Sequence, residues 1–328
     1  MPAILFLTLI FGQLQRWKGL YLHDAVLVLL LMFNYKKLKI YRPVLWFVIA
    51  GLVSLAVNGF PLIASLYLLR FFSYSLLLNL KIKPKYLLWL SSGIATLGLL
   101  QYIFLPDTRF LASLNWDDHY YRLISTLFDP NFTGIILVLG LILTLFKFPR
   151  VWWLYLIQVP ALLLTYSRSS YLALFAAGFY LAVVKKKMKF FLLGFGILCL
   201  MLLALPRPGG EGVKLERLFS VTSRLDNYQE GIKLWLKHPV FGLGFNNLRA
   251  VRADLISHAA GGLDSSLLFV LATTGIIGLA AYFNLLKCLW EKNLLLRVSL
   301  VALLVHSLFV NSLFYPWVMI WLWSIVNG

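Results

Sequence analysis

The sequence predicts an all-α polytopic membrane protein, a bundle of about twelve transmembrane helices with one large extracytoplasmic loop that contains an amphipathic helix. Hydrophobic residues make up 61% of the 328 residues and charged residues only 13%, far from the roughly half and about a quarter of soluble proteins. The mean hydropathy is +0.84, and most apolar runs approach the roughly 20 residues that cross a bilayer. Helices are expected because an open sheet would leave backbone amides unsatisfied in lipid.

Apolar runs between charged, proline or glycine breakers place the expected helices along the chain. The spans lie near residues 2–14, 22–34, 43–57, 61–80, 86–105, 131–146, 151–166, 169–184, 190–205, 265–286, 298–311 and 313–326. One integral membrane domain is therefore expected, in which residues 1–205 hold the first nine helices, 206–264 form the large loop and 265–328 hold the last three. Cys199 and Cys288 lie in separate apolar runs, so neither a disulfide framework nor a cysteine metal site is implied.

The distribution of charge predicts the orientation of the helices. When the gaps between spans alternate between two sides, the basic gaps 35–42, 81–85, 147–150, 185–189 and 287–297 share one face with a single acid, Glu291. By the positive-inside rule this face is cytoplasmic. The chain is thus expected in the cytoplasmic (inner) membrane, in contact with membrane lipid and with both termini cytoplasmic. The net charge of +18 is explained by basic residues in the gaps, which orient the helices. It therefore does not indicate a nucleic-acid partner, and none is expected.

The large loop concentrates charged residues in a chain that is otherwise apolar. Within it, Ser223 and Asp226 resemble a capping box, and apolar residues follow at spacings of three and four until Pro239, namely Leu225, Tyr228, Ile232 and Trp235. This pattern predicts an amphipathic helix that starts near Ser223 and lies on the membrane or closes over the bundle. The candidate chemistry of the protein is therefore expected on the extracytoplasmic side.

Two arginines are the main candidates for binding an anion. Arg168 lies at the tight outer turn before a helix, where free amides and a guanidinium group favour phosphate or pyrophosphate; the alternative is an arginine that snorkels at a helix end. Arg224 is expected at the start of the amphipathic helix, again beside free amides, with a solvated surface charge as the alternative. Arg217 and Arg249 in the same loop are further candidates, as are Arg122, before the expected sixth span, and Asn131, at its start.

Other polar residues are candidates for proton transfer or for lining a site. His258 is by default a solvent-facing loop histidine, although the pKa range of histidine suits a general base. Asp264 precedes a helix, so its plain role is an N-cap; the alternative is an N-cap carboxylate at a cavity rim that also accepts a proton. Arg70 lies in the middle of a span, where an arginine is costly and suggests function.

The shorter outer loop holds a possible cation site. Asp117, Asp118 and His119 are adjacent and of the types that bind a divalent ion, although adjacent loop acids are usually only solvated. No metal site is therefore predicted.

Four stretches of the sequence resemble the O-antigen ligase and polymerase family of bacterial membrane enzymes. The first stretch runs from Arg122 to Asn131, and the second from Thr165 to Arg168. The third begins at Ser223 and Arg224 and continues through Trp235 to His238, Pro239, Gly242 and Gly244. The fourth runs from Leu267 to Leu279 and includes Gly275 and Gly278. Their order and loop placement agree over about residues 115–285, whereas the amino-terminal third is similar in hydropathy alone.

The resemblance implies a metal-independent glycosyltransferase that needs neither a nucleotide sugar nor a cofactor, and inversion at the anomeric carbon is expected. Its donor would be a glycan on undecaprenyl pyrophosphate, and its acceptor a sugar or lipid hydroxyl. Arg168 and Arg224 would hold the leaving pyrophosphate. The family's His-Asn pair falls on Asp264 and Ser265, so the base is either Asp264 or His258. Two other functions stay open: a transporter or flippase of lipid-linked glycans, and a catalytically inactive relative.

Overall fold

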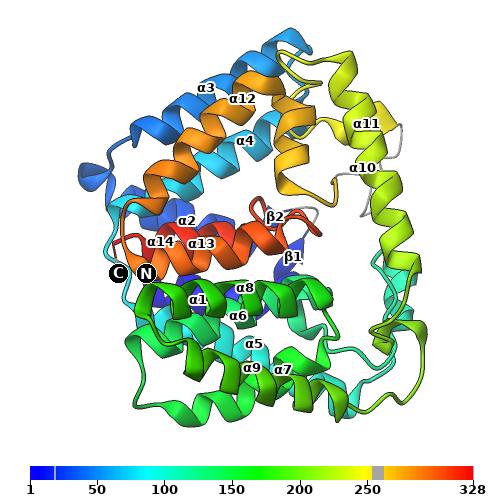
Figure 1. The fold of residues 1–328 in the computed structure, drawn as a ribbon. Coiled ribbons are helices and arrows are strands. Elements are labelled where there is room, and N and C mark those ends of the chain that lie inside the picture. Colours follow the sequence, from blue (N-terminus) through cyan, green and yellow to red (C-terminus); the bar gives the residue numbers. More distant parts are fainter. Residues whose placement is uncertain (18–19, 253–261, 328) are drawn as a thin grey trace. The chain divides into compact units, whose positions relative to one another are not determined.

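The computed structural model describes residues 1–17, 20–252 and 262–327, and these residues are predominantly helical (Figure 1). Their α-helices are α1 Pro2–Ile10, α2 Leu22–Phe33, α3 Arg42–Val57, α4 Leu62–Ser75, α5 Pro84–Phe104, α6 Pro130–Lys147, α7 Tyr155–Leu164, α8 Arg168–Lys185, α9 Met188–Leu203, α10 Phe219–Lys237, α11 Leu248–Arg252, α12 Ser266–Trp290, α13 Leu294–His306 and α14 Pro316–Ile325. Two-residue strands, β1 (Arg16–Trp17) and β2 (Leu20–Tyr21), form an antiparallel pair.

Each of the twelve apolar runs is helical, which confirms the all-α class. Four helices are long and apolar enough to cross a membrane, namely Leu62–Asn79, Pro84–Phe104, Pro130–Lys147 and Ser266–Trp290. Several other apolar helices have only 10–17 residues. A helix of 16 residues is about 24 Å long, which is shorter than the thickness of the hydrocarbon core of a bilayer. These helices support membrane-protein character, and the number of spans and their orientation remain predictions.

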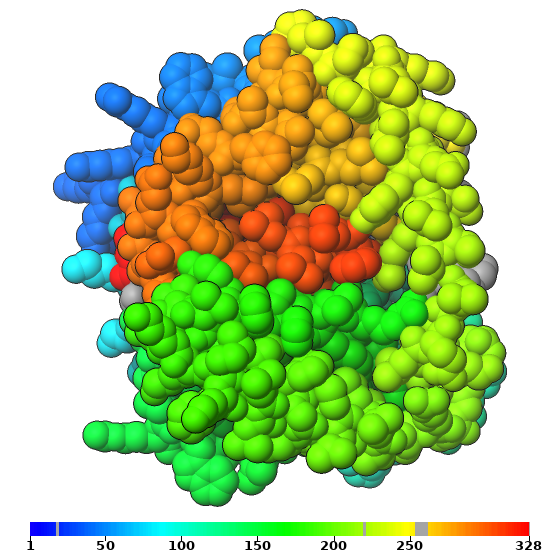
Figure 2. All heavy atoms as spheres, in the orientation of Figure 1, coloured from blue at the N-terminus to red at the C-terminus, as the bar shows by residue number. Residues whose placement is uncertain are grey.

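The described chain forms two compact units, each assembled from separated segments. The first contains Met1–Leu30, Ile82–Arg217 and Leu294–His306, and the second contains Leu31–Lys81, Leu218–Asn293 and Ser307–Gly328. In the first unit α5 packs against α1, α6 and α7, and α13 packs against α8 and α6. Its core includes fully buried α6 residues from Ile135 to Leu139. By contrast, α9 buries none of its residues (the green surface in Figure 2), as expected of a helix that faces lipid.

In the second unit α12 packs against α3 and α10, and a close glycine contact joins the loop after α10 to α12. Gly275 has φ +65° and ψ −167°, which interrupts α12 (Figure 1). A Cβ on Gly275 would lie 2.1 Å from the Val240 carbonyl oxygen, and one on Gly242 would lie 2.3 Å from the Thr273 carbonyl carbon. The Leu243 N–H also donates to the Ala272 carbonyl at 3.1 Å. Two of the stretches that resemble the family are therefore packed backbone to backbone.

The predicted start of the amphipathic helix is wrong by one turn. The helix α10 begins at Phe219, and the Leu218 carbonyl accepts hydrogen bonds from the N–H groups of Val221 and Thr222 at 2.7 and 3.2 Å. Ser223 and Asp226 consequently lie inside the helix and do not cap it. Arg224 is the sixth residue of α10, beyond the first four amides that lack partners in a helix. The expectation that free amides flank Arg224 is therefore also wrong.

Candidate functional site

The turn between α7 and α8 places Arg168 at the first position of a helix, as the sequence predicts. Ser167 is the N-cap, and its side chain accepts a hydrogen bond from the Ser170 N–H at 3.4 Å. Tyr166 is fully buried, has φ +50° and donates its hydroxyl hydrogen to the Pro206 carbonyl. This left-handed residue reverses the chain within a few residues. The Thr165 and Tyr166 carbonyls are thereby presented to neighbouring arginines.

Two further arginines converge on these carbonyl groups. Arg122 is only 8% exposed, and its Nε donates to the Thr165 carbonyl at 3.0 Å. Its Nη2 lies 3.5 Å from the Tyr166 carbonyl oxygen, which also accepts from Nη2 of Arg217 at 3.1 Å. The structure therefore brings Arg122 and Arg217, both sequence candidates, to the turn that carries Arg168.

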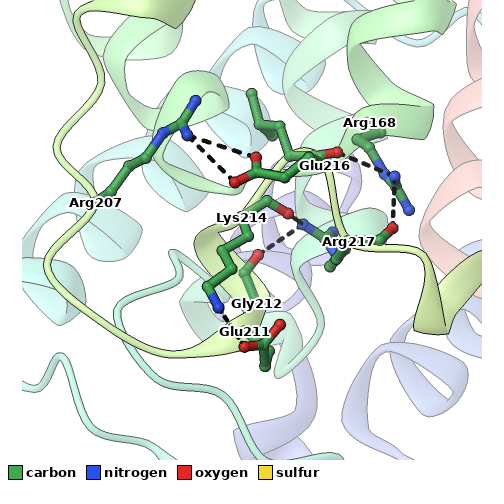
Figure 3. A network of polar contacts seen from close by, with 8 residues as sticks. Arg168, Arg207, Glu211, Gly212, Lys214, Glu216 and Arg217 are labelled. Carbon is green, nitrogen blue, oxygen red and sulfur yellow. Dashed lines mark hydrogen bonds and ion pairs between the residues drawn. The ribbon is translucent and has the colours of Figure 1, made fainter.

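The segment 206–217 crosses this turn and is fixed to it by Arg168 (Figure 3). Nη1 of Arg168 donates to the carbonyls of Leu215 and Arg217 at 3.0 and 2.9 Å. Nη1 of Arg217 donates to two carbonyls of its own segment, those of Gly212 and Lys214, at 2.8 and 2.7 Å. A Cβ on Gly212 would lie 2.7 Å from Cδ of Arg122, so a glycine is needed for this close approach.

These contacts orient the arginine side chains. Through hydrogen bonds to neutral carbonyl groups, the structure places the guanidinium groups of Arg122, Arg168 and Arg217 near one turn. Such a cluster, at the start of a helix, favours a phosphate or pyrophosphate group. We call Arg122, Arg168 and Arg217 the arginine cluster.

A buried polar network supports the start of α8. Oδ1 of Asn131 accepts from Oγ of Ser167 at 2.9 Å, and Oγ of Ser170 lies 3.3 Å from Nε2 of His306. Ser167, Ser170 and His306 are fully buried. Asn131 is thus a residue that positions the turn. His306 was missed in the sequence, where its only signal is a histidine at the end of an apolar run.

His119 lies beside the arginine cluster in a fixed stretch of the shorter loop. Its carbonyl accepts from both the backbone N–H and the hydroxyl of Thr108, each at 2.9 Å. Burial, followed by the positive charges of Arg122 and Arg217, lowers the pKa of His119 from 6.5 to about 3. Its imidazole is therefore neutral at physiological pH.

We expect this histidine to make the folded protein sensitive to acid. Because its pKa is lower in the folded state than in the unfolded state, the unfolded chain binds the additional proton, and stability falls as the pH drops from about 6.5 towards 3. Between pH 7 and pH 5 the loss attributable to His119 is about 2 kcal/mol at most. Thermal unfolding followed by tryptophan fluorescence should show a smaller acid shift in His119→Gln than in the natural protein. Equal shifts would contradict the assignment.

In the second unit, Arg224 and Asp264 lie around one tyrosine. Tyr228 has a raised pKa, caused first by burial and then by the negative charge of Asp264, while the charge of Arg224 lowers it. The guanidinium carbon of Arg224 also lies 5.6 Å from the centre of the Phe309 ring, within the range of a cation–π contact. The structure thus brings one candidate base and one candidate phosphate ligand to the same part of this unit.

Asp264 does not have the predicted capping role. The N-cap of α12 is Ser265, whose Oγ accepts from the Leu268 N–H at 3.4 Å. Asp264 precedes the cap, and its N–H donates to Oδ1 of Asn227 at 2.8 Å. Ser265 therefore occupies the capping position that the sequence assigned to Asp264.

Described residues on both sides of positions 253–261 contact α10. His258 itself lies outside the described residues. Before these positions, Arg252 forms an ion pair with Glu230 at 2.7 Å and donates to the Gly262 carbonyl at 2.8 Å. After them, the Asp264 N–H is bound by Asn227. The residues flanking His258 are therefore held on the helix that carries Arg224.

The remaining candidates lie apart from these groups within their own units. Arg70, on α4, stacks on Tyr67 at 5.3 Å and lines a cavity of about 80 Å³ with Asn246 and Asn311. Arg249 is half-buried on the short helix α11. Within the described residues no group of three or more His, Cys, Asp or Glu side chains is placed to hold a metal ion.

Comparison with known proteins matches part of the chain to one family. Residues 153–283 match the family model described as O-antigen ligase, which confirms the resemblance seen in the sequence. The matched region includes Arg168, Arg217, Arg224 and Asp264. No curated protein matches the chain.

Proposed function

We propose that this chain, whose residues 153–283 belong to the O-antigen ligase family, is a glycosyltransferase that moves a glycan from undecaprenyl pyrophosphate to an acceptor hydroxyl. Family membership supports ligase-type chemistry on lipid-linked glycans in general. The donor, the acceptor type, the inner-membrane location and the outer-face site are parts of the proposal. The observation that carries it is the arginine cluster on the turn of Arg168.

The reaction would transfer the anomeric carbon of the glycan from one oxygen to another. The acceptor hydroxyl oxygen attacks the anomeric carbon, the bond from this carbon to the phosphate oxygen breaks, and the configuration inverts. Negative charge develops on the leaving pyrophosphate. Preorganised guanidinium groups stabilise this charge more in the transition state than in the bound donor, so the arginine cluster lowers the barrier. No metal ion or nucleotide sugar is required by this step.

Arg224 would complete the pyrophosphate site from the large loop. The positive charge of Arg224 acts on Tyr228, as does the negative charge of Asp264. The guanidinium group of Arg224 therefore lies in the part of the second unit that holds a candidate base.

The acceptor proton would pass to Asp264 or to His258. Asp264 and Arg224 both act electrostatically on Tyr228 in the second unit. Arg252 and Asp264, described residues that flank the positions around His258 in the sequence, both contact α10. Either group would serve as a general base if it reaches the hydroxyl. Comparing Asp264→Asn with His258→Asn identifies which of the two is required.

The proposal is tested by reconstituting the purified protein in vesicles with an undecaprenyl-pyrophosphate-linked oligosaccharide and a candidate acceptor. The expected result is transfer of the glycan and release of undecaprenyl pyrophosphate, also in the presence of a metal chelator. Lipid translocation without transfer would instead identify a flippase. The absence of both, across lipid-linked donors that related enzymes use, would support a catalytically inactive relative.

A further inference from the structure

The side chain of His119 lies close enough to Arg122 and Arg217 for their charges to act on it, and it has no role in the proposed chemistry. Its Nε2 atom is buried and makes no hydrogen bond within the described part of the chain. A buried polar nitrogen without a partner costs free energy. Such an atom is therefore expected where a ligand completes the site.

Several contacts fix His119 against the cluster. The neighbouring residue Tyr120 pairs with Asp107 in an antiparallel bridge, and the His119 carbonyl is held by Thr108. Segment 206–217 lies over this stretch: a Cβ on Gly210 would be 3.2 Å from the Tyr120 ring, and one on Gly212 would be 2.7 Å from Cδ of Arg122. The imidazole is thus enclosed by elements that carry Arg122 and Arg217.

The charges around the imidazole match an anionic ligand. Arg122, on the same loop, and Arg217, on the covering segment, are the charged groups that lower its pKa. Burial in the first place, and then these two charges, keep the ring neutral when no anion is bound. A pyrophosphate group would offset their charge and make protonation of the ring more favourable. In the neutral Nε2–H tautomer and in the protonated ring alike, Nε2 donates a hydrogen bond.

We infer that His119 is a ligand of the pyrophosphate group, with Nε2 donating to a phosphate oxygen held by Arg122 and Arg217. The inference rests on the proposed function for its physiological ligand, the leaving group of the lipid-linked donor. Beside the arginines, the imidazole is a neutral hydrogen-bond donor. Its protonation becomes more favourable as negative charge builds up on the leaving group. Free pyrophosphate and a prenyl pyrophosphate share this chemistry, so both are used as probes.

Binding of inorganic pyrophosphate to the full-length protein in detergent micelles tests this inference. Titration calorimetry should show that His119→Ala weakens binding about tenfold or more, since hydrogen bonds to charged groups are of that size. His119→Gln, which keeps an N–H donor, should retain more affinity than His119→Ala. The control His238→Ala removes an exposed histidine at the end of α10 and should leave affinity unchanged.

A second readout detects the ring itself. The protein has five histidines, so the ¹⁵N signals of His119 are identified by their loss in His119→Gln. Pyrophosphate should shift the Nε2 signal and raise the pH at which the ring titrates. Farnesyl pyrophosphate, as a stand-in for the lipid, should compete for the same site if the ligand is the donor's leaving group. Failure to compete would assign the site to free pyrophosphate.

The outcomes separate this inference from the proposed function. It is overturned if His119→Ala binds pyrophosphate as tightly as the natural protein, if the ring signals do not respond, or if the natural protein binds no pyrophosphate. Glycan transfer with an unaffected His119→Ala variant would leave the enzyme assignment standing without His119. Tight binding that depends on His119, without any glycan transfer, would retain the site and remove the assignment.

Discussion

Arg168→Ala is expected to reduce glycan transfer by roughly 100- to 1,000-fold in kcat, the range seen when one preorganised donor to a developing anion is removed. The side chain has two consequences in the structure. It brings a positive charge to the start of α8, and its Nη1 ties segment 206–217 to the turn through the Leu215 and Arg217 carbonyls. Removing it weakens both the charge and the placement of Arg217.

Two variants separate these contributions. Arg168→Lys keeps the charge but not the planar fork of donors, so intermediate activity is expected. Arg207→Ala removes a nearby exposed arginine, whose partner is Glu216 at 3.4 Å, and should have little effect because exposed ion pairs contribute little. Initial rates measured with the reconstituted lipid-linked donor, on variants with unchanged thermal unfolding, provide the comparison. Near-normal turnover of Arg168→Ala would remove Arg168 from the catalytic machinery.

Gly275→Ala is expected to destabilise the protein by about 3 kcal/mol or more. Its φ and ψ of +65° and −167° lie in a region used almost only by glycine, which costs about 1–3 kcal/mol for another residue. The added methyl group would also lie 2.1 Å from the Val240 carbonyl oxygen, and overpacking of this kind typically costs a further 1–3 kcal/mol. The contact between α12 and the 240–244 loop would have to open.

Thermal unfolding in detergent measures this effect against a matched glycine. Gly196→Ala, in the exposed helix α9, meets no atom within 4 Å of its added Cβ. It should leave stability unchanged or raise it by about 0.4–1 kcal/mol through a lower entropy of the unfolded chain. Equal unfolding temperatures for the Gly275→Ala and Gly196→Ala variants would contradict the packing described here.

Hydropathy predicted the helices well because each apolar run must satisfy its own backbone in lipid. The start of α10 was not predicted, since this helix is largely polar and depends less on such a constraint. Ser223 and Asp226 have the spacing of a capping box, yet Leu218 begins the helix through its carbonyl group alone. A capping-box spacing does not fix the start of a helix when the residues before it can also adopt helical geometry.

The candidate site was predictable only in part. The tight turn and the helix start at Arg168 are local, so the sequence indicated them. The contacts of Arg122 and Arg217 with Thr165 and Tyr166 bridge 43–51 residues, and no local pattern encodes such a separation. For the same reason, the sequence did not indicate that His119 lies beside these arginines, because this depends on the contacts of the distant segment 206–217 with the shorter loop.

An experimental structure of the protein with bound undecaprenyl pyrophosphate tests the central claim most directly. The account predicts pyrophosphate oxygens within hydrogen-bond distance of the guanidinium groups of both Arg168 and Arg224, on the extracytoplasmic side. A pyrophosphate bound elsewhere, or one contacted by neither arginine, would contradict it.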